Sequence, residues 1–205
     1  MADFIRYPCH WEVIPPILEE TCFCNTCIEK FKADTGINLP PDLKTTKDKA
    51  AFILDSHSLE WYAWRCEQIT GFAKEVKKAL TEENPKLELG LFAVPWREGE
   101  LNNAIINIIA QDIKKLSSYV DVFSAMTYHK MCGKDINWIS EISKYMQDKT
   151  AKKVVPILQA TDVSKEVLAE AITKTFSNNK AGLVVFDMNT IINDKKEETI
   201  KITFD

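Results

Sequence analysis

The chain has 205 residues, of which 45% are hydrophobic and 27% are charged, so it is long enough for one good core or for part of a larger one. Its net charge of −4 and isoelectric point near 5.5 exclude the basic stripe that is typical of a nucleic-acid-binding protein. No apolar run approaches the roughly 18 residues that a membrane span needs, and the N-terminal residues predict neither a signal peptide nor a membrane partner.

The first part of the chain predicts one short strand followed by helices. Residues 3–8 form a short apolar segment that ends at Pro8, because proline has no N–H to donate to a strand ladder. A long loop over 9–21 follows, and then a helix over 24–35 that Gly36 closes in a left-handed conformation. Apolar residues at helical spacing predict one long helix over 46–80, or two helices with a break near 56–58.

The rest of the chain alternates between apolar strands and amphipathic helices. The predicted strands cover residues 87–95, 120–126, 154–159 and 181–187. The predicted helices cover residues 104–116, 136–146, 164–176 and 189–204. Ser164 is the expected N-cap of the third of these helices.

Five apolar strands that alternate with helices indicate an α/β fold with a parallel sheet covered on both faces. An open doubly wound sheet and a (β/α)₈ barrel both fit this alternation. No glycine-rich phosphate loop follows any strand, and the chain has only six glycines, which argues against a nucleotide-binding open sheet. Polar or aromatic residues at nearly every strand end favour the barrel. The sequence therefore predicts a partial TIM (β/α)₈ barrel, a single incomplete domain over 1–205.

Three carboxylates are candidates for catalysis. Asp3 lies on the first predicted strand, where a barrel enzyme places a nucleophile or a general acid/base. Glu98 and Glu100 follow the second strand, and glycoside hydrolysis needs a second carboxylate. The alternatives are structural: Asp3 pairs with Arg6 and ties the strand end, and the two glutamates are solvated.

Polar and aromatic residues after the later strands are candidates for substrate binding. Trp96 offers a ring face to a sugar or belongs to the core. Tyr128 and His129 hydrogen-bond a substrate hydroxyl or cap a strand. Gln159 and Asp187 contact a ligand, or Asp187 is a structural cap.

Three of the six cysteines, Cys22, Cys24 and Cys27, lie within six residues. This crowding suits a metal better than a disulfide framework, and tetrahedral zinc accepts three thiolates with a fourth ligand from elsewhere. Cys9 is the best fourth ligand in the chain, ahead of His10 and Cys66. Such a site is structural, because four sulfur ligands leave no open position. A redox role for the CxxC spacing is the alternative, and no organic cofactor is predicted.

Two motifs resemble a known family. The segment Asp3-Phe-Ile-Arg-Tyr-Pro8 resembles the D-[YF]-[IV]-R-[YF]-P signature at the end of the fourth strand of glycoside-hydrolase-like (β/α)₈ proteins. Cys22-Phe-Cys24-Asn-Thr-Cys27, with Phe31, resembles the C-x-C-x-x-C-x-x-x-F cluster of zinc-carrying β-galactosidase-type barrels. Three downstream segments are similar to the fifth and sixth strands and a flanking helix of that family: Trp61-x-x-Trp64-Arg65, Gly90-Leu-Phe-Ala-Val-Pro-Trp96 and Asp121-Val-Phe-Ser-Ala-Met-Thr-Tyr128-His129.

The resemblance implies that the chain is the C-terminal part of a barrel, strands four to eight, with Asp3 at a catalytic position and Arg6 beside it as a substrate contact. The family carries a glutamate on its fourth strand and another on its seventh, where this chain has Asp3 and Gln159. This departure speaks against a two-glutamate mechanism and favours Asp3 as the nucleophile with Glu98 or Glu100 as the acid.

The predicted function is therefore a glycoside hydrolase module that cleaves a glycosidic bond in an oligo- or polysaccharide with paired carboxylates. A non-catalytic carbohydrate-binding barrel and a zinc-stabilised interaction module are the alternatives. An arc of five strands leaves sheet edges unpaired, so we expect either the missing N-terminal strands or self-association to cover them. The family likeness points to a secreted or periplasmic full-length protein without fixing the compartment.

Overall fold

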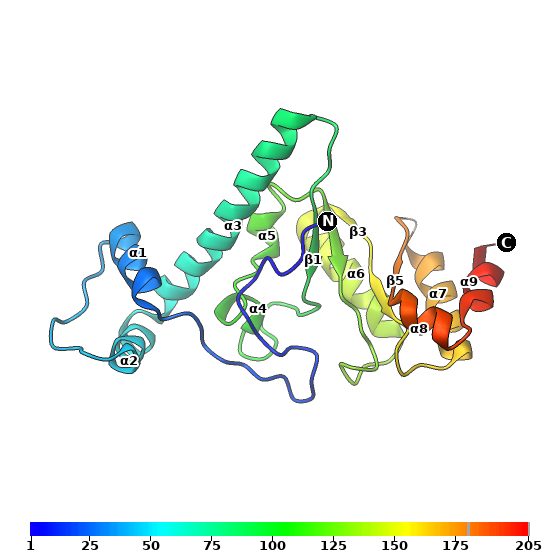
Figure 1. The fold of residues 1–205 in the computed structure, drawn as a ribbon, viewed down its shortest axis with the longest axis horizontal. Helices are drawn as coiled ribbons and strands as arrows, with labels where there is room; N and C mark the ends of the chain where they lie inside the picture. The colour runs from blue at the N-terminus through cyan, green and yellow to red at the C-terminus, as the bar shows by residue number, and fades with distance from the viewer. Residues whose placement is uncertain (180, 205) are drawn as a thin grey trace.

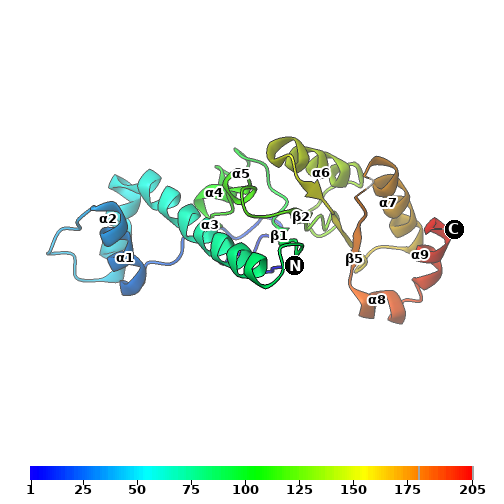
Figure 2. The ribbon, with the colours of Figure 1, turned by 90° about the horizontal axis from the view of Figure 1, so that it is seen from above.

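The computed structural model describes residues 1–179 and 181–204, and it shows a mixed α/β chain with parallel strands in two small sheets (Figure 1). Helices α1 (Asn25–Thr35) and α2 (Thr46–Ser56) lie at one end of the molecule in both ribbon views (Figure 2). Helices α7 (Lys165–Asn178), α8 (Met188–Asn193) and α9 (Glu197–Phe204) lie at the other end. The strands lie between these two groups of helices. No helix in the described part of the chain is both long and apolar enough to cross a membrane.

The two sheets keep the strands in sequence order. Strands β1 (Gly90–Ala93), β2 (Val122–Ala125) and β3 (Lys153–Val154) form one sheet, and β4 (Ile157–Gln159) pairs with β5 (Val184–Phe186) in the other. All of these pairs are parallel.

A single predicted strand, 154–159, is divided between the two sheets. The Val155 N–H donates to the Phe123 carbonyl at 2.8 Å, whereas the next carbonyl, that of Pro156, accepts from Val184 at 2.9 Å. The segment therefore changes partner from β2 to β5 at Pro156, which has no N–H to continue the first ladder. Four of the five predicted strands therefore form, and one of these four, the strand over 154–159, is interrupted.

The strand predicted over residues 3–8 does not form, although the residue before it, Ala2, makes a strand contact. Ala2 makes one parallel bridge to Leu91, and its N–H donates to the Gly90 carbonyl at 2.7 Å. Phe4 then adopts a φ of 55°, which turns the chain away from β1 and leaves the Phe4 side chain 73% exposed. A left-handed residue cannot continue a strand.

The N-terminal helices form a lobe with its own core. They are α1 (Asn25–Thr35), α2 (Thr46–Ser56) and the first half of α3 (Ser58–Glu83). The predicted break is confirmed at His57, and Gly36 closes α1 with a φ of 74° as predicted. Thr45 and Asp48 form a capping box at the start of α2. The buried side chains of this lobe are Ile28, Phe31, Ile53, Trp61 and Trp64.

The second half of α3 reaches the three-stranded sheet. Ala73 of α3 shares a hydrophobic core with Leu91 and Phe123 of the strands, and residues of α5 and α6 belong to the same core. These helices are α5 (Ile113–Leu116) and α6 (Asn137–Thr150). The face of the sheet that carries these strand residues is therefore covered by helices.

The predicted helix over 104–116 is interrupted, and only α4 (Ala104–Asn107) and α5 form. Helix α4 ends at Asn107, and Ala110, which lies between the two helices, has a φ of 55°. Gln111 is fully buried; its Oε1 accepts from the Val94 N–H at 3.0 Å, and its Nε2 donates to the Ile5 carbonyl at 3.1 Å. The Gln111 side chain therefore joins the N-terminal segment to the end of β1, and it lies at the break between α4 and α5.

The C-terminal helices pack around β4 and β5. Helix α7 (Lys165–Asn178) begins at the predicted N-cap, since Ser164 Oγ accepts from the Val167 N–H at 3.3 Å. The predicted tail helix is divided into α8 (Met188–Asn193) and α9 (Glu197–Phe204). The buried residues of this region include Leu158, Leu168, Ile172 and Ile191.

Candidate functional site

A cavity of about 420 Å³ lies where the loops after β1 and β2 meet the N-terminal loop. Most of its lining is apolar, and three tryptophans border it with exposed fractions of only 4–8%, so most of each ring packs in the core. The only charged residues of the lining are Glu100 and Lys134. The lining residues used below are Trp11, Trp96, Glu100, Cys132, Lys134 and Trp138. Loops after parallel strands are the usual place for a ligand site in α/β proteins.

Tyr128 is stacked between aromatic rings beside this cavity. The Trp11 ring lies 5.6 Å from it and the Phe186 ring lies 5.7 Å from it, both between ring centroids. Burial, together with the negative charges of Asp3 and Glu12, raises the pKa of Tyr128 to about 12.

Glu12 was not anticipated from the sequence. Its Oε2 atom is buried and has no hydrogen-bond partner. Its charge also acts on the Cys132 thiol, whose pKa burial raises to about 11. Its position next to Trp11, in a loop with no regular structure, was the only available signal.

The three predicted catalytic carboxylates lie in different environments. Asp3 is exposed, its Oδ1 accepts the Phe4 N–H at 2.7 Å, and it makes no ion pair with Arg6. Glu98 pairs with Lys149 of α6 at 2.8 Å. Glu100 lines the cavity and also accepts the Arg97 N–H at 3.0 Å. The structure thus places Glu100 at the cavity and Glu98 against α6, whereas Asp3 is exposed and is not part of the cavity lining.

Arg6 and His129 are both largely enclosed by protein. The Arg6 guanidinium lies over the Phe4 ring at 5.2 Å and donates to the Tyr7 carbonyl at 3.3 Å. His129 is 4% exposed, and its Nδ1 is buried without a partner. Burial and the charge of Lys130 lower the pKa of His129, so the imidazole is neutral at pH 7.

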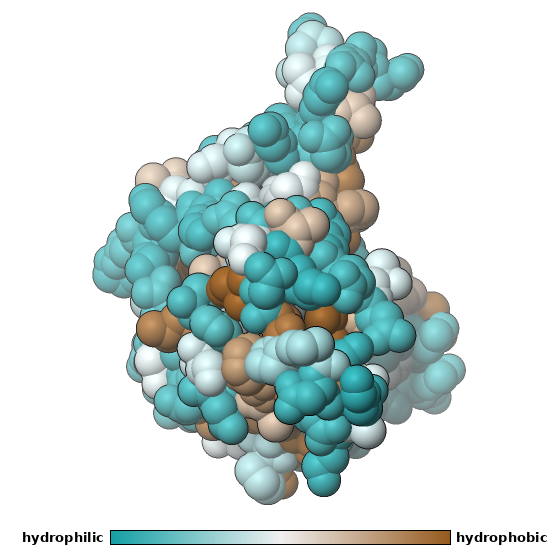
Figure 3. Space-filling view, turned by 90° about the vertical axis from the view of Figure 1, so that its left-hand side faces the viewer, coloured by the Kyte–Doolittle hydropathy of each residue, from teal (hydrophilic) through white to brown (hydrophobic). Residues whose placement is uncertain are grey.

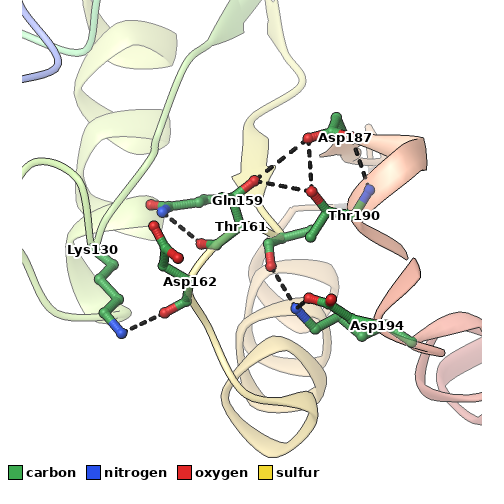
Figure 4. A network of polar contacts seen from close by, with 9 residues as sticks. Lys130, Gln159, Thr161, Asp162, Asp187, Thr190 and Asp194 are labelled. Carbon is green, nitrogen blue, oxygen red and sulfur yellow. Dashed lines mark hydrogen bonds and ion pairs between the residues drawn. The ribbon is translucent and has the colours of Figure 1, made fainter. Parts of the chain in front are cut away.

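Gln159 and Asp187 serve the protein's own hydrogen bonds (Figure 4). The Gln159 amide accepts the Met131 N–H at 3.0 Å and donates to the Thr161 carbonyl at 2.7 Å, so it ties the loop after β2 to the end of β4. Asp187 caps α8, where it accepts the N–H and the hydroxyl of Thr190, each at 2.9 Å. These hydrogen bonds lower the pKa of Asp187. Of the two roles predicted for Asp187, the structure therefore shows the structural cap.

The three clustered cysteines lie close enough to bind a metal ion. The Sγ atoms of Cys22, Cys24 and Cys27 all lie within 4.8 Å of one another at the start of α1. Hydrogen bonding from the Cys27 backbone N–H lowers the pKa of Cys24, whereas burial raises the pKa of Cys27 to about 12. Cys9 is not part of this group, and its thiol instead donates to the Ile17 carbonyl at 3.2 Å.

Arg65 connects the cysteine loop to the rest of the molecule. This residue of α3 is fully buried, and its guanidinium pairs with Glu20 at 3.0 Å, two residues before Cys22. It also lies over the Tyr7 ring at 4.4 Å and donates to the Ile108 carbonyl. One side chain thus holds the N-terminal segment and the approach to the cysteine cluster against α3.

Comparison of the chain with models of known protein families finds no match, and comparison with curated protein sequences finds none either.

Proposed function

We propose that this chain is an arc of a (β/α)₈ barrel with a carbohydrate site at the carboxyl ends of its strands, and that the site hydrolyses a glycosidic bond. The observation that carries the proposal is the cavity of about 420 Å³ at these strand ends, which is lined by three tryptophans and one carboxylate, that of Glu100. Aromatic rings suit the C–H faces of a sugar, and a pair of carboxylates suits glycoside hydrolysis.

The order of the strands supports the barrel. Ala2 bridges to β1, β1 pairs with β2, β2 pairs with β3, and β4 pairs with β5, in every case in parallel. A doubly wound sheet reverses its strand order at a switch point, whereas a barrel places each strand next to the one that follows it. Each neighbour in this chain is the next strand in sequence.

Within this proposal Asp3 is the nucleophile. Glu100 is the better placed of the two predicted acids, because it lines the cavity while Glu98 is paired with Lys149. Trp96, Tyr128 and Arg6 form the surroundings of the bound sugar.

We further propose that the cysteine cluster holds a structural zinc ion. Three sulfur donors within 4.8 Å of one another are a donor set that zinc accepts, with one further ligand required. The ion would fix the start of α1 and the end of the loop that carries Trp11.

The test is release of reducing sugar from a panel of polysaccharides and aryl glycosides, with the chain alone and with any natural upstream sequence. Turnover that Asp3→Asn lowers by a factor of about 10³ or more is the expected result, because a nucleophile has no substitute in the mechanism. Full turnover by Asp3→Asn would remove Asp3 from the mechanism, and no turnover on any substrate would contradict hydrolysis.

A non-catalytic carbohydrate-binding barrel is the second candidate. It is favoured by Gln159, whose amide makes hydrogen bonds to Met131 and Thr161 within the protein, at the strand where the family carries a glutamate. Binding of oligosaccharides without turnover would support it. Metal-dependent folding with neither binding nor turnover would instead support a zinc-stabilised interaction module.

A further inference from the structure

We propose that the site binds an acidic polysaccharide, which extends from the cavity of about 420 Å³ past Lys134 into a second cavity. This inference rests on the proposed carbohydrate site, and it names the class of glycan that the motifs leave open. The second cavity has a volume of about 450 Å³ and lies between the loop after β2 and helix α7.

Lys134 joins the two cavities. It lines the first cavity together with Trp11 and Trp96, and it lines the second together with His129. The Lys134 side chain is exposed and forms no ion pair with any described residue. A ligand that is long enough to occupy both cavities therefore passes along an unpaired lysine.

The other lysines of the second cavity are not paired with carboxylates either. Lys130 donates to the backbone carbonyl of Asp162, which is a neutral acceptor and leaves the lysine charge uncompensated. Lys174 of α7 is half-buried and has no ion pair within the described part of the chain. Together with Lys134, these residues place three uncompensated positive charges along the two cavities.

The carboxylates of the two cavities do not cancel these charges. Glu100 accepts the Arg97 N–H at 3.0 Å and pairs with the Arg97 guanidinium at 3.8 Å. Asp135 accepts the Trp138 N–H at 3.2 Å at the start of α6, where the helix dipole compensates a negative charge. Glu170 is exposed on α7 and is the remaining carboxylate of the two linings. In a chain with a net charge of −4, this local excess of positive charge favours an acidic ligand.

His129 gives independent support for a ligand in the second cavity. It lines this cavity, it is only 4% exposed, and its Nδ1 is buried without a hydrogen-bond partner. Buried polar atoms normally have a partner, and the residue that carries this one borders space that a ligand can fill. A glycan offers hydroxyl groups to an imidazole and C–H faces to Trp11 and Trp96 of the first cavity, and acidic substituents add the charge that suits the lysines.

The test measures binding of oligogalacturonates and of their methyl esters, which keep the sugar backbone and lose the charge, by isothermal titration calorimetry. The charged oligosaccharides should bind more tightly, and the difference should shrink at high salt. Lys134→Gln should weaken their binding by a factor of about 2 to 5 at low salt, which is the usual worth of an exposed ion pair, and should leave binding of the methyl esters unchanged. The matched control is Lys144→Gln, an exposed lysine of α6 that lines neither cavity.

Two further ligands define the chemistry of the acidic group. Dextran sulfate is compared with dextran, and a preference for the sulfated polymer alone would support an acidic glycan and assign sulfate esters in place of carboxylates. Polyglutamate carries carboxylates without a sugar. If it binds as tightly as oligogalacturonate of equal charge, the lysines attract any polyanion and the inference is overturned.

The outcomes separate this inference from the proposed function. Equal binding of the charged and esterified oligosaccharides, or equal losses in Lys134→Gln and Lys144→Gln, overturns the acidic substrate and leaves a neutral glycan site standing. Acidic glycans that bind without release of reducing sugar support this inference and contradict hydrolysis. Turnover of neutral glycans alone supports hydrolysis and overturns this inference. No binding of any glycan overturns both proposals.

Discussion

The pKa of Tyr128 responds to the charges of two carboxylates of the N-terminal segment, Asp3 and Glu12. Burial and the charges of Asp3 and Glu12 together raise this pKa to about 12, because negative charges disfavour the phenolate. Asp3→Asn and Glu12→Gln should therefore each lower the pKa of Tyr128, and the double variant should lower it further. Titration of ¹³C-labelled tyrosine rings by NMR measures this, with Tyr128→Phe to assign the signal.

The control for this measurement is Glu98→Gln, whose carboxylate pairs with Lys149 and is not among the charges that act on Tyr128. A pKa of Tyr128 that is the same in Asp3→Asn, Glu12→Gln and the unaltered chain would mean that neither carboxylate lies near the phenol.

At the scale of single residues, the sequence indicates which types of side chain occupy a site better than it indicates the contacts that these side chains make. It identified Tyr128 and Glu100, which border or line the cavity, because polar residues after a strand meet at one edge. It left two roles open for Asp187, and the cap at α8 depends on Thr190, three residues away. Glu12 carried no signal beyond its place next to Trp11, because the stack of Trp11 on Tyr128 joins residues 117 positions apart in the numbering.

At the scale of elements, the hydrophobic period predicts where helices and strands exist but not where they are interrupted. The apolar stripe over 104–116 is real, since Ala104, Ile105, Ile113 and Leu116 are all buried. The interruption at Gln111 satisfies buried groups of β1 and the N-terminal segment, and such a long-range need has no local signature. The break at His57 was predictable because Ser56 and Ser58 flank it.

The cysteine loop is an element whose stability should depend on zinc. The fully buried Arg65 anchors the loop through Glu20, while the sulfur atoms at its end lack any disulfide among the described residues. Zinc at 100 times its dissociation constant should stabilise the fold by about 2.7 kcal/mol, and a chelator should remove that gain. Thermal melts with one equivalent of zinc, with and without chelator, measure it.

Single cysteine variants locate the ligands of this ion. Cys22→Ser, Cys24→Ser and Cys27→Ser should each abolish the stabilisation, and Cys132→Ser should not, because Cys132 lies at the cavity. Cys9→Ser decides whether Cys9 is the fourth ligand: loss of zinc affinity would place it in the site. Equal melting of the chain with zinc and with chelator would contradict the zinc proposal.

At the scale of the whole molecule, the surface is uneven. The side that carries α1 and α2 is mainly hydrophilic, with apolar groups visible in a central hollow (Figure 3). The edge strand β5 exposes more apolar surface. Its Val184 and Phe186 are 41% and 55% exposed, and Met188, which follows the strand, is 67% exposed. At the N-terminal edge Phe4 is 73% exposed. Exposed apolar side chains on unpaired strands are sites of association.

We therefore predict that the chain alone self-associates through the β5 edge unless further strands cover it. Val184→Lys should shift the chain toward the monomer, because a charged side chain on an edge strand disfavours pairing with another strand. Light scattering after size-exclusion chromatography over a range of concentrations measures the mass.

The matched control is Leu59→Lys, which removes a leucine that is 79% exposed on α3, far from β5 along the molecule (Figure 1). If Leu59→Lys lowers the mass as much as Val184→Lys does, association is a matter of general surface apolarity rather than of this edge. If the unaltered chain is already monomeric at every concentration, the open edge of β5 is stable in water by itself, and covering strands are not needed to explain the arc.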